Sequence, residues 1–119
     1  MDRSIAADKQ SRFYWTVKNI REKVAEAKVV VFAKGTVEHP LDGFSKKVLL
    51  EVESTGKPFT TIDVSEDRSI QPALIAFSGH RDLPLVYIDG HLTTSEDNMS
   101  AMVEGGELRH AVEEAFGKN

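Results

Sequence analysis

The strongest constraint on the fold is a buried-strand pattern followed, after a short loop, by an amphipathic helix. Residues 29–32 form a β-branched and aromatic run between polar neighbours, which predicts a buried strand of a central sheet. Beyond the loop 34–45, apolar residues recur at helical spacing to about residue 55, where a glycine and a proline end the pattern. This succession places Asp42 at or next to the helix N-cap, where its carboxylate meets unpaired backbone N–H groups.

The rest of the chain alternates between helix and strand patterns. Helices are expected over about 13–27, 65–77, 95–103 and 108–116, and strands over 59–64, 85–88 and 91–93. Ser65-Glu66-Asp67 is expected to cap the second of these helices, and Asp89-Gly90 predicts a tight hairpin. Strand–helix–strand units predict parallel pairs, and the closing hairpin predicts an antiparallel edge strand.

Length and composition predict one domain. A chain of 119 residues with 40% hydrophobic content has room for a single core, which we place in residues 12–119. Residues 1–11 are polar and without periodicity, so we expect a flexible N-terminal lead-in. The aromatic cluster Phe13-Tyr14-Trp15 is expected to pack against the domain rather than to form a binding site, because rings bury large apolar areas.

Charge and cysteine content exclude several functions. The 15 basic and 19 acidic residues are interspersed and leave a net charge of -4, which favours neither nucleic acid nor a membrane surface as a partner. There is no secretory signal pattern and no apolar run near the roughly 20 residues that span a bilayer, so a cytoplasmic protein is expected. The chain has no cysteine, which excludes disulfides, thiolate metal ligands and thiol nucleophiles of its own.

The segment 34–45 resembles the active-site segment of the monothiol glutaredoxins, where Lys-Gly-Thr is followed by Pro-x-Cys-Gly-Phe-Ser. The matching residues are Lys34, Gly35, Thr36, Pro40, Gly43, Phe44 and Ser45, and the family's reactive cysteine falls on Asp42. Further matches across about residues 17–110 are Gly56-Lys57-Pro58-Phe59, Pro84 at the family's cis-proline, Tyr87-Ile88-Asp89-Gly90 and Gly106-Glu107-Leu108. The resemblance implies an α/β, thioredoxin-like (glutaredoxin) fold: three α/β/α layers around a four-stranded mixed sheet with flanking helices.

The same resemblance implies a chemistry that Asp42 changes. In the family the thiolate attacks a glutathione mixed disulfide, or joins glutathione in holding a [2Fe-2S] cluster between two protomers. A carboxylate keeps the negative charge but is neither a soft nucleophile nor a soft ligand, so no catalytic residue is predicted. Lys34 matches the family lysine that approaches the cysteine and a glutathione carboxylate. The alternative is that Asp42 only caps the helix and Lys34 is an ordinary solvated lysine.

By resemblance, the former glutathione groove is formed by Lys34, Asp42, Phe44, Leu83, Pro84 and Asp97. The family's Trp-Pro-Thr is replaced by His80-Arg81-Asp82, and its Gly-Gly-Ser/Cys-Asp by Thr94-Ser95-Glu96-Asp97. The added carboxylates of Asp82 and Glu96 are expected to weaken the binding of anionic glutathione.

The sequence is compatible with three functional hypotheses. The first is a non-redox binding or regulatory module with a protein or peptide partner; the second is a carrier of glutathione or an iron–sulfur cluster; the third is an enzyme that uses Asp42 as base or nucleophile. No cofactor and no metal site are predicted, and the oligomeric state is left open. A divalent-metal site is a further alternative, since fold analogy brings His39, Asp42, His80, Asp82 and Glu96 to one rim, although they have no recognised metal-ligand spacing.

Overall fold

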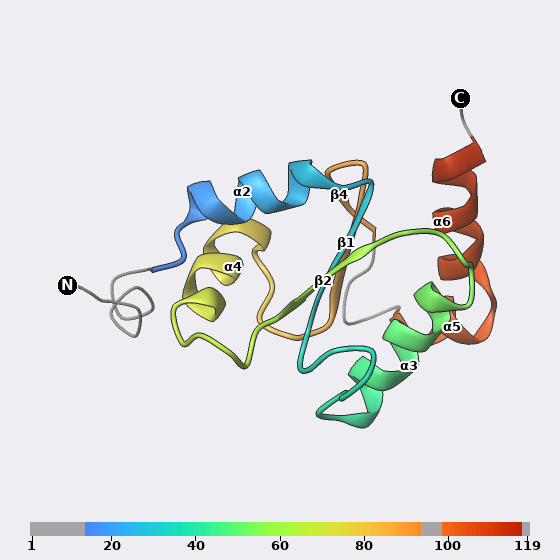
Figure 1. Ribbon diagram of the computed structural model, residues 1–119, viewed down its shortest axis with the longest axis horizontal. Coiled ribbons are helices and arrows are strands. Elements are labelled where there is room, and N and C mark those ends of the chain that lie inside the picture. The colour runs from blue at the N-terminus through green and yellow to red at the C-terminus, as the bar shows by residue number, and fades with distance from the viewer. Residues whose placement is uncertain (1–13, 94–98, 118–119) are drawn as a thin grey trace.

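The computed structural model describes residues 14–93 and 99–117. Their elements follow the predicted order of helices and strands (Figure 1). They are α2 (Val17–Glu26), β1 (Val29–Ala33), α3 (Gly43–Glu53), β2 (Thr60–Asp63), α4 (Ile70–Ser78), β3 (Leu85–Ile88), β4 (His91–Leu92), α5 (Met99–Glu104) and α6 (Glu107–Gly117). The lead-in predicted for residues 1–11 and the helix caps predicted for residues 95–97 fall outside the described residues. None of the described helices is both long and apolar enough to cross a membrane.

The four strands form one mixed sheet in the order β2-β1-β3-β4. β1 pairs parallel with β2, and β3 pairs antiparallel with both β1 and β4. The expectation of parallel pairs therefore holds for β1-α3-β2 and is wrong for β2-α4-β3. The registers give the reason: Asp63 at the end of β2 pairs with Ala33, and Leu85 at the start of β3 pairs with Phe32. Because the chain leaves and re-enters the sheet at the same end, β3 must run the opposite way.

Helices cover both faces of the sheet, which confirms the three-layer prediction. Along β1, Val30 and Phe32 point into a cluster with α2 and α4, whereas Val29 and Val31 point into a cluster with α3, α5 and α6. Figure 1 shows α2 and α4 side by side on one side of the sheet and the other three helices on the opposite side. All five residues of β1 are buried because each face of a central strand is covered.

One local prediction is wrong, and another holds only in part. Helix α4 begins at Ile70 with Ser69 as its N-cap, so Ser65-Glu66-Asp67 does not supply the cap. Instead, the Asp67 carboxylate accepts hydrogen bonds from the Ser69 amide at 2.9 Å and hydroxyl at 2.8 Å, a local turn that competes with helix. In the aromatic cluster, Trp15 packs against the α2–α4 side as expected, but Tyr14 is 69% exposed. Phe13 lies outside the described residues.

Candidate functional site

The candidate site lies at the carboxyl end of β1, where the chain turns through residues 34–42 into α3. Asp42 is the N-cap of α3, as predicted, with extended backbone at φ −147°. Its Oδ1 accepts a hydrogen bond from the Ser45 amide at 2.7 Å, and its carbonyl accepts the first helical bond from Lys46 at 3.0 Å. One carboxylate oxygen is therefore committed to the helix end.

The second oxygen of the same carboxylate faces a cation. Lys34 Nζ lies 3.8 Å from Asp42 Oδ2, and the two side chains are 49% and 39% exposed. The structure thus brings together two of the three charged groove candidates, and the third, Asp97, lies outside the described residues. Such a half-exposed pair contributes little to stability, about 0–1 kcal/mol.

The loop before Asp42 depends on the glycine at its start. Gly35 has φ +94° and forms an isolated antiparallel bridge with Pro40. A Cβ at this position would lie 2.3 Å from the carbonyl oxygen of His39 and 2.7 Å from the amide nitrogen of Leu41. Both the backbone conformation and the close approach of the returning chain therefore require glycine here.

Two side chains hold consecutive amides where β1 ends. The Lys34 amide donates to Ser45 Oγ at 3.1 Å, and the Gly35 amide donates to Asp63 Oδ1 at 2.9 Å. Ser45 is completely buried, and Asp63 is half-buried. Burial by itself raises the pKa of Asp63, but the hydrogen bonds from Ser65 and from the Gly35 amide outweigh it and lower that pKa below its ordinary 3.8.

Asp63 is not among the site residues predicted from the sequence, because its position in the predicted strand 59–64 indicates no functional role. A local signal was available only for the turn that follows, because an Asp side chain often accepts a hydrogen bond from the backbone two residues further on; nothing local indicates the bond to Gly35. The structure shows the hydrogen bond of this turn, with Asp63 Oδ1 accepting from the Ser65 amide at 2.9 Å.

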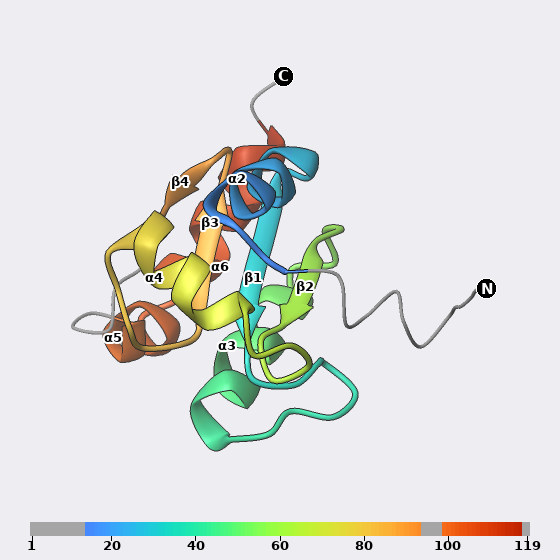
Figure 2. The same cartoon turned by 90° about the vertical axis from the view of Figure 1, so that its left-hand side faces the viewer.

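The remaining groove candidates lie on different faces of the domain. The Leu83–Pro84 peptide bond is cis, as predicted, and Pro84 is buried one position before Leu85, which pairs with Phe32 of β1. This register brings Pro84 beside the end of β1, at the same end of the sheet as the loop and the start of α3 (Figure 2). Leu83 packs against the α2–α4 side, and Phe44 against the α3–α6 side. Asp97 lies outside the described residues.

The described residues give no support to the divalent-metal site that was considered as an alternative. No group of three or more His, Asp or Glu side chains within residues 14–93 and 99–117 is placed to hold a metal ion. The exposed His39 donates its amide to Thr36 Oγ1, and the half-buried His80 donates its amide to Ser78 Oγ. Asp82 is exposed, and Glu96 falls outside the described residues.

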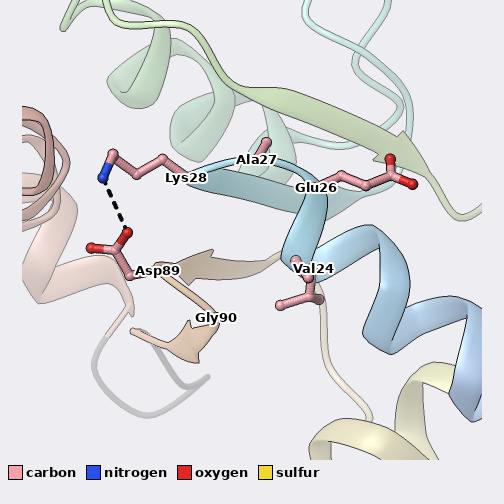
Figure 3. A pocket seen from close by; sticks show the side chains of 7 residues that line it. Val24, Glu26, Ala27, Lys28, Asp89 and Gly90 are labelled. Atoms are coloured by element: carbon pink, nitrogen blue, oxygen red, sulfur yellow. Dashed lines mark hydrogen bonds and ion pairs between the residues drawn. The ribbon is translucent and has the colours of Figure 1, made fainter.

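An open hollow of about 490 Å³ lies at the opposite end of the sheet, between the end of α2 and the β3–β4 turn (Figure 3). Three charged residues line it, and each has an ion-pair partner: Lys28 Nζ lies 3.3 Å from Asp89 Oδ1, and Glu26 Oε1 lies 3.4 Å from Lys23 Nζ. The Lys28 ammonium also lies 5.7 Å from the centre of the Phe116 ring. These contacts hold the β3–β4 turn and α6 against the start of β1. We therefore interpret the residues around the hollow as structural and do not include them in the candidate site.

Comparisons with known proteins identify the family. The Glutaredoxin family model matches residues 29–93, which hold the four strands, the loop 34–42, α3 and α4. The chain belongs to the glutaredoxin family. Its relatives include an uncharacterized ycf64-like monothiol glutaredoxin of Synechocystis, 35% identical over 85% of this chain and 94% of that protein. A probable monothiol glutaredoxin 2 of Rickettsia typhi is 36% identical over 77% of this chain and 83% of that protein.

Longer proteins and solved structures agree with this placement. Human Glutaredoxin-3 is 35% identical over 70% of this chain, a match that spans 25% of that longer protein. The solution structure of reduced poplar apo GrxS14 superposes with a TM-score of 0.68 at 31% identity, covering 85% of this chain and 93% of the poplar chain. The predicted family and fold are therefore confirmed. In this glutaredoxin Asp42 stands at the position of the reactive cysteine, and the chain supplies no other thiol.

Proposed function

We propose that this glutaredoxin is a binding or regulatory module that works without thiol chemistry and takes an extended peptide-like ligand in the former glutathione groove. The observation that supports the proposal is that both carboxylate oxygens of Asp42 already have partners within the domain. At the position of the nucleophile, this glutaredoxin has a carboxylate that caps α3 through one oxygen and faces Lys34 through the other. Both of its oxygens have structural partners, and neither is a soft nucleophile.

The chemistry of disulfide reduction explains why this substitution matters. Reducing a mixed disulfide requires a thiolate to attack one sulfur, form a new sulfur–sulfur bond and release the other sulfur as a thiolate. An aspartate oxygen cannot form a stable bond of that kind, and it cannot supply the electrons that reduce the disulfide. The same carboxylate is a poor ligand for an iron–sulfur cluster, whose irons favour thiolate.

The groove keeps features that suit a peptide-like ligand. The backbone before the buried cis-Pro84 lies at the sheet end beside β1, and main-chain groups there can pair with an extended chain whatever its side chains. Lys34 is 49% exposed and offers an ammonium to a ligand carboxylate. A buckwheat glutaredoxin of the same fold, 24% identical, is known in complex with glutathione, which makes glutathione the first ligand to test.

The two charges at the groove set how well that ligand binds. A ligand carboxylate that approaches Lys34 must compete with Asp42, which already lies 3.8 Å from the same ammonium. A thiolate that approaches the start of α3 would meet the negative charge of Asp42. We therefore expect weak binding of glutathione and better binding of a neutral or amide-rich segment that uses the backbone edge.

A turnover assay tests the absence of thiol chemistry. We would measure glutathione-dependent reduction of a mixed disulfide by the wild type, by Asp42→Cys and by Asp42→Ser. The wild type and Asp42→Ser should give only background, while Asp42→Cys, which restores a thiol at the helix N-terminus, should give turnover that scales with protein concentration. Wild-type turnover that scales with protein concentration would overturn the proposal.

A binding experiment tests the groove itself. Reduced glutathione is titrated into the ¹⁵N-labelled wild type while amide shifts are followed by NMR. Saturable shifts confined to the loop 34–45 and to residues near Pro84 would support a surviving groove. Shifts that are absent, or that appear only around Lys28 and Asp89 at the other end of the sheet, would contradict it.

A further inference from the structure

We propose that Asp63, a β2 residue outside the groove, positions Lys34 for ligand binding by holding the backbone of Gly35. The inference deepens the proposed function and rests on it, because the direction of Lys34 matters only if the groove binds a ligand. Asp63 is a positioning residue and not a ligand contact. Its sequence distance from Lys34 is 29 positions, and its influence passes through one hydrogen bond from the backbone.

The geometry of the two peptide groups that flank Lys34 supports this. The amide of Lys34 donates to Ser45 Oγ at 3.1 Å, and the amide of Gly35 donates to Asp63 Oδ1 at 2.9 Å. These N–H groups belong to the peptide planes on either side of the Lys34 Cα. Fixing both planes fixes both backbone dihedral angles of Lys34, and so the direction in which its side chain leaves the chain.

The anchor is itself rigid. Asp63 Oδ1 also accepts hydrogen bonds from the Ser65 amide at 2.9 Å and from the Ser65 hydroxyl at 2.6 Å. The Asp63 backbone pairs with Ala33 in the parallel register, and the Val64 amide donates to the Ala33 carbonyl at 2.9 Å. The carboxylate is therefore tied to β1 through the sheet as well as through the Gly35 amide.

A role for Asp63 in the local turn alone predicts different effects of substitution. A turn over residues 63–65 needs only the bonds to Ser65, whereas the bond to Gly35 links two elements of the site. The substitution Ser65→Ala removes the hydroxyl bond and leaves the Gly35 bond in place. The substitution Asp63→Asn keeps an acceptor oxygen without the charge, and Asp63→Ala removes the acceptor altogether. These three variants separate the turn, the charge and the positioning bond.

The first test uses the ligand-free ¹⁵N-labelled chain. We would measure hydrogen exchange of the Gly35 amide and residual dipolar couplings of the Lys34 and Gly35 amides, with Val31 in the buried strand as an internal reference for global stability. In Asp63→Ala we expect Gly35 exchange to accelerate about tenfold relative to Val31, as for the loss of one hydrogen bond, and the two couplings to change. Asp63→Asn and Ser65→Ala should keep both values close to those of the wild type.

The second test uses glutathione as the probe. The dissociation constant from the NMR titration should rise about three- to tenfold in Asp63→Ala and stay within about twofold in Asp63→Asn and Ser65→Ala. Rescue by Asn would show that the acceptor matters and not the charge or the fold.

The outcomes separate the two proposals. If Asp63→Ala frees the Gly35 amide but leaves glutathione affinity unchanged, the positioning role is wrong. It is equally wrong if Asp63→Asn behaves like Asp63→Ala, or if the ligand-free couplings do not change in Asp63→Ala. If wild-type protein does not bind glutathione while the couplings change as expected, the proposed function fails, and the control of Lys34 by Asp63 still stands on the ligand-free measurement.

Discussion

The substitution Asp42→Ala separates the structural part of this position from its chemistry. Alanine removes the Oδ1 acceptor of the Ser45 amide, which lies 2.7 Å away, and the Oδ2 partner of Lys34. The backbone at Asp42 is extended, so alanine fits it without strain. The change is therefore expected to lower stability through the lost cap and the lost ion pair alone.

The magnitude follows from these two contacts. Replacing an N-cap Asp by Ala costs about 1 kcal/mol. The ion pair adds at most about 0.5 kcal/mol, because its atoms are 3.8 Å apart and both side chains are more than a third exposed. The free energy of unfolding should then fall by about 1–1.5 kcal/mol. With a urea m-value of about 1.5 kcal/mol/M, the midpoint should move down by about 0.7–1 M.

Urea unfolding followed by circular dichroism measures this, with Asp42→Asn as the matched control. Asparagine caps a helix about as well as aspartate but cannot pair with Lys34, so it should lose about 0.5 kcal/mol or less. Adding Lys34→Met to each variant gives a double-mutant cycle for the ion pair. An Asp42→Ala variant as stable as the wild type, or an Asp42→Asn variant as unstable as Asp42→Ala, would refute the reasoning.

Three further predictions concern the loop, the core and the anchor. Gly35→Ala should lower the free energy of unfolding by about 2 kcal/mol or more, because Gly35 has positive φ and an added Cβ would meet the His39 carbonyl. The matched control is Gly56→Ala, which has positive φ but open space around the added Cβ and should cost only about 1 kcal/mol. Urea unfolding midpoints of the two variants measure the difference. Burial raises the pKa of Tyr87 from 10.0 to about 12, so the unfolded chain loses this proton first and stability should fall by about 2 kcal/mol as the pH rises from 10.0 to about 12. Tyr87→Phe should remove that fall, and a fall that persists in this variant would exclude Tyr87 as its cause. The lowered pKa of Asp63 predicts a contribution that is present above pH 3.8 and lost as the pH falls through the folded pKa, so acid titration of stability should lose this component in Asp63→Asn.

The fold was largely readable from the sequence because its elements carry local signals. Four consecutive apolar residues mark β1, and the Asp89-Gly90 turn, with Asp89 at φ 52°, marks the hairpin. The direction of β3 was not readable, because it depends on the end of the sheet at which the chain re-enters after α4. The start of α4 was also misplaced, because Asp67 has the same local chemistry in a turn as at a helix cap.

The candidate site also has features that could be predicted from the sequence and features that could not. Asp42 as an N-cap follows from the order of strand, loop and helix, and its approach to Lys34 was implied by the resemblance to the glutaredoxins. The hydrogen bond from the Gly35 amide to Asp63 joins residues 28 positions apart. No local pattern in the sequence specifies which distant amide a side-chain acceptor will bind. The assignment of Phe44, Leu83, Pro84 and Asp97 to the groove stays a prediction that ligand binding must test.

The position of Asp42 shows why a retained fold and a retained activity are separate questions. A cysteine at a helix N-terminus serves both electrostatics and redox chemistry, since its thiolate is stabilised by the helix end and also attacks sulfur. Aspartate caps the helix N-terminus at least as well, because its carboxylate accepts a hydrogen bond from the Ser45 amide. Its carboxylate does not replace the thiolate as a nucleophile toward sulfur. Selection for stability alone would therefore accept this substitution, and the conformation of the loop through Gly35 and Pro40 would persist without turnover. It follows that family membership assigns the scaffold of this chain, while its function must be decided by what the groove binds.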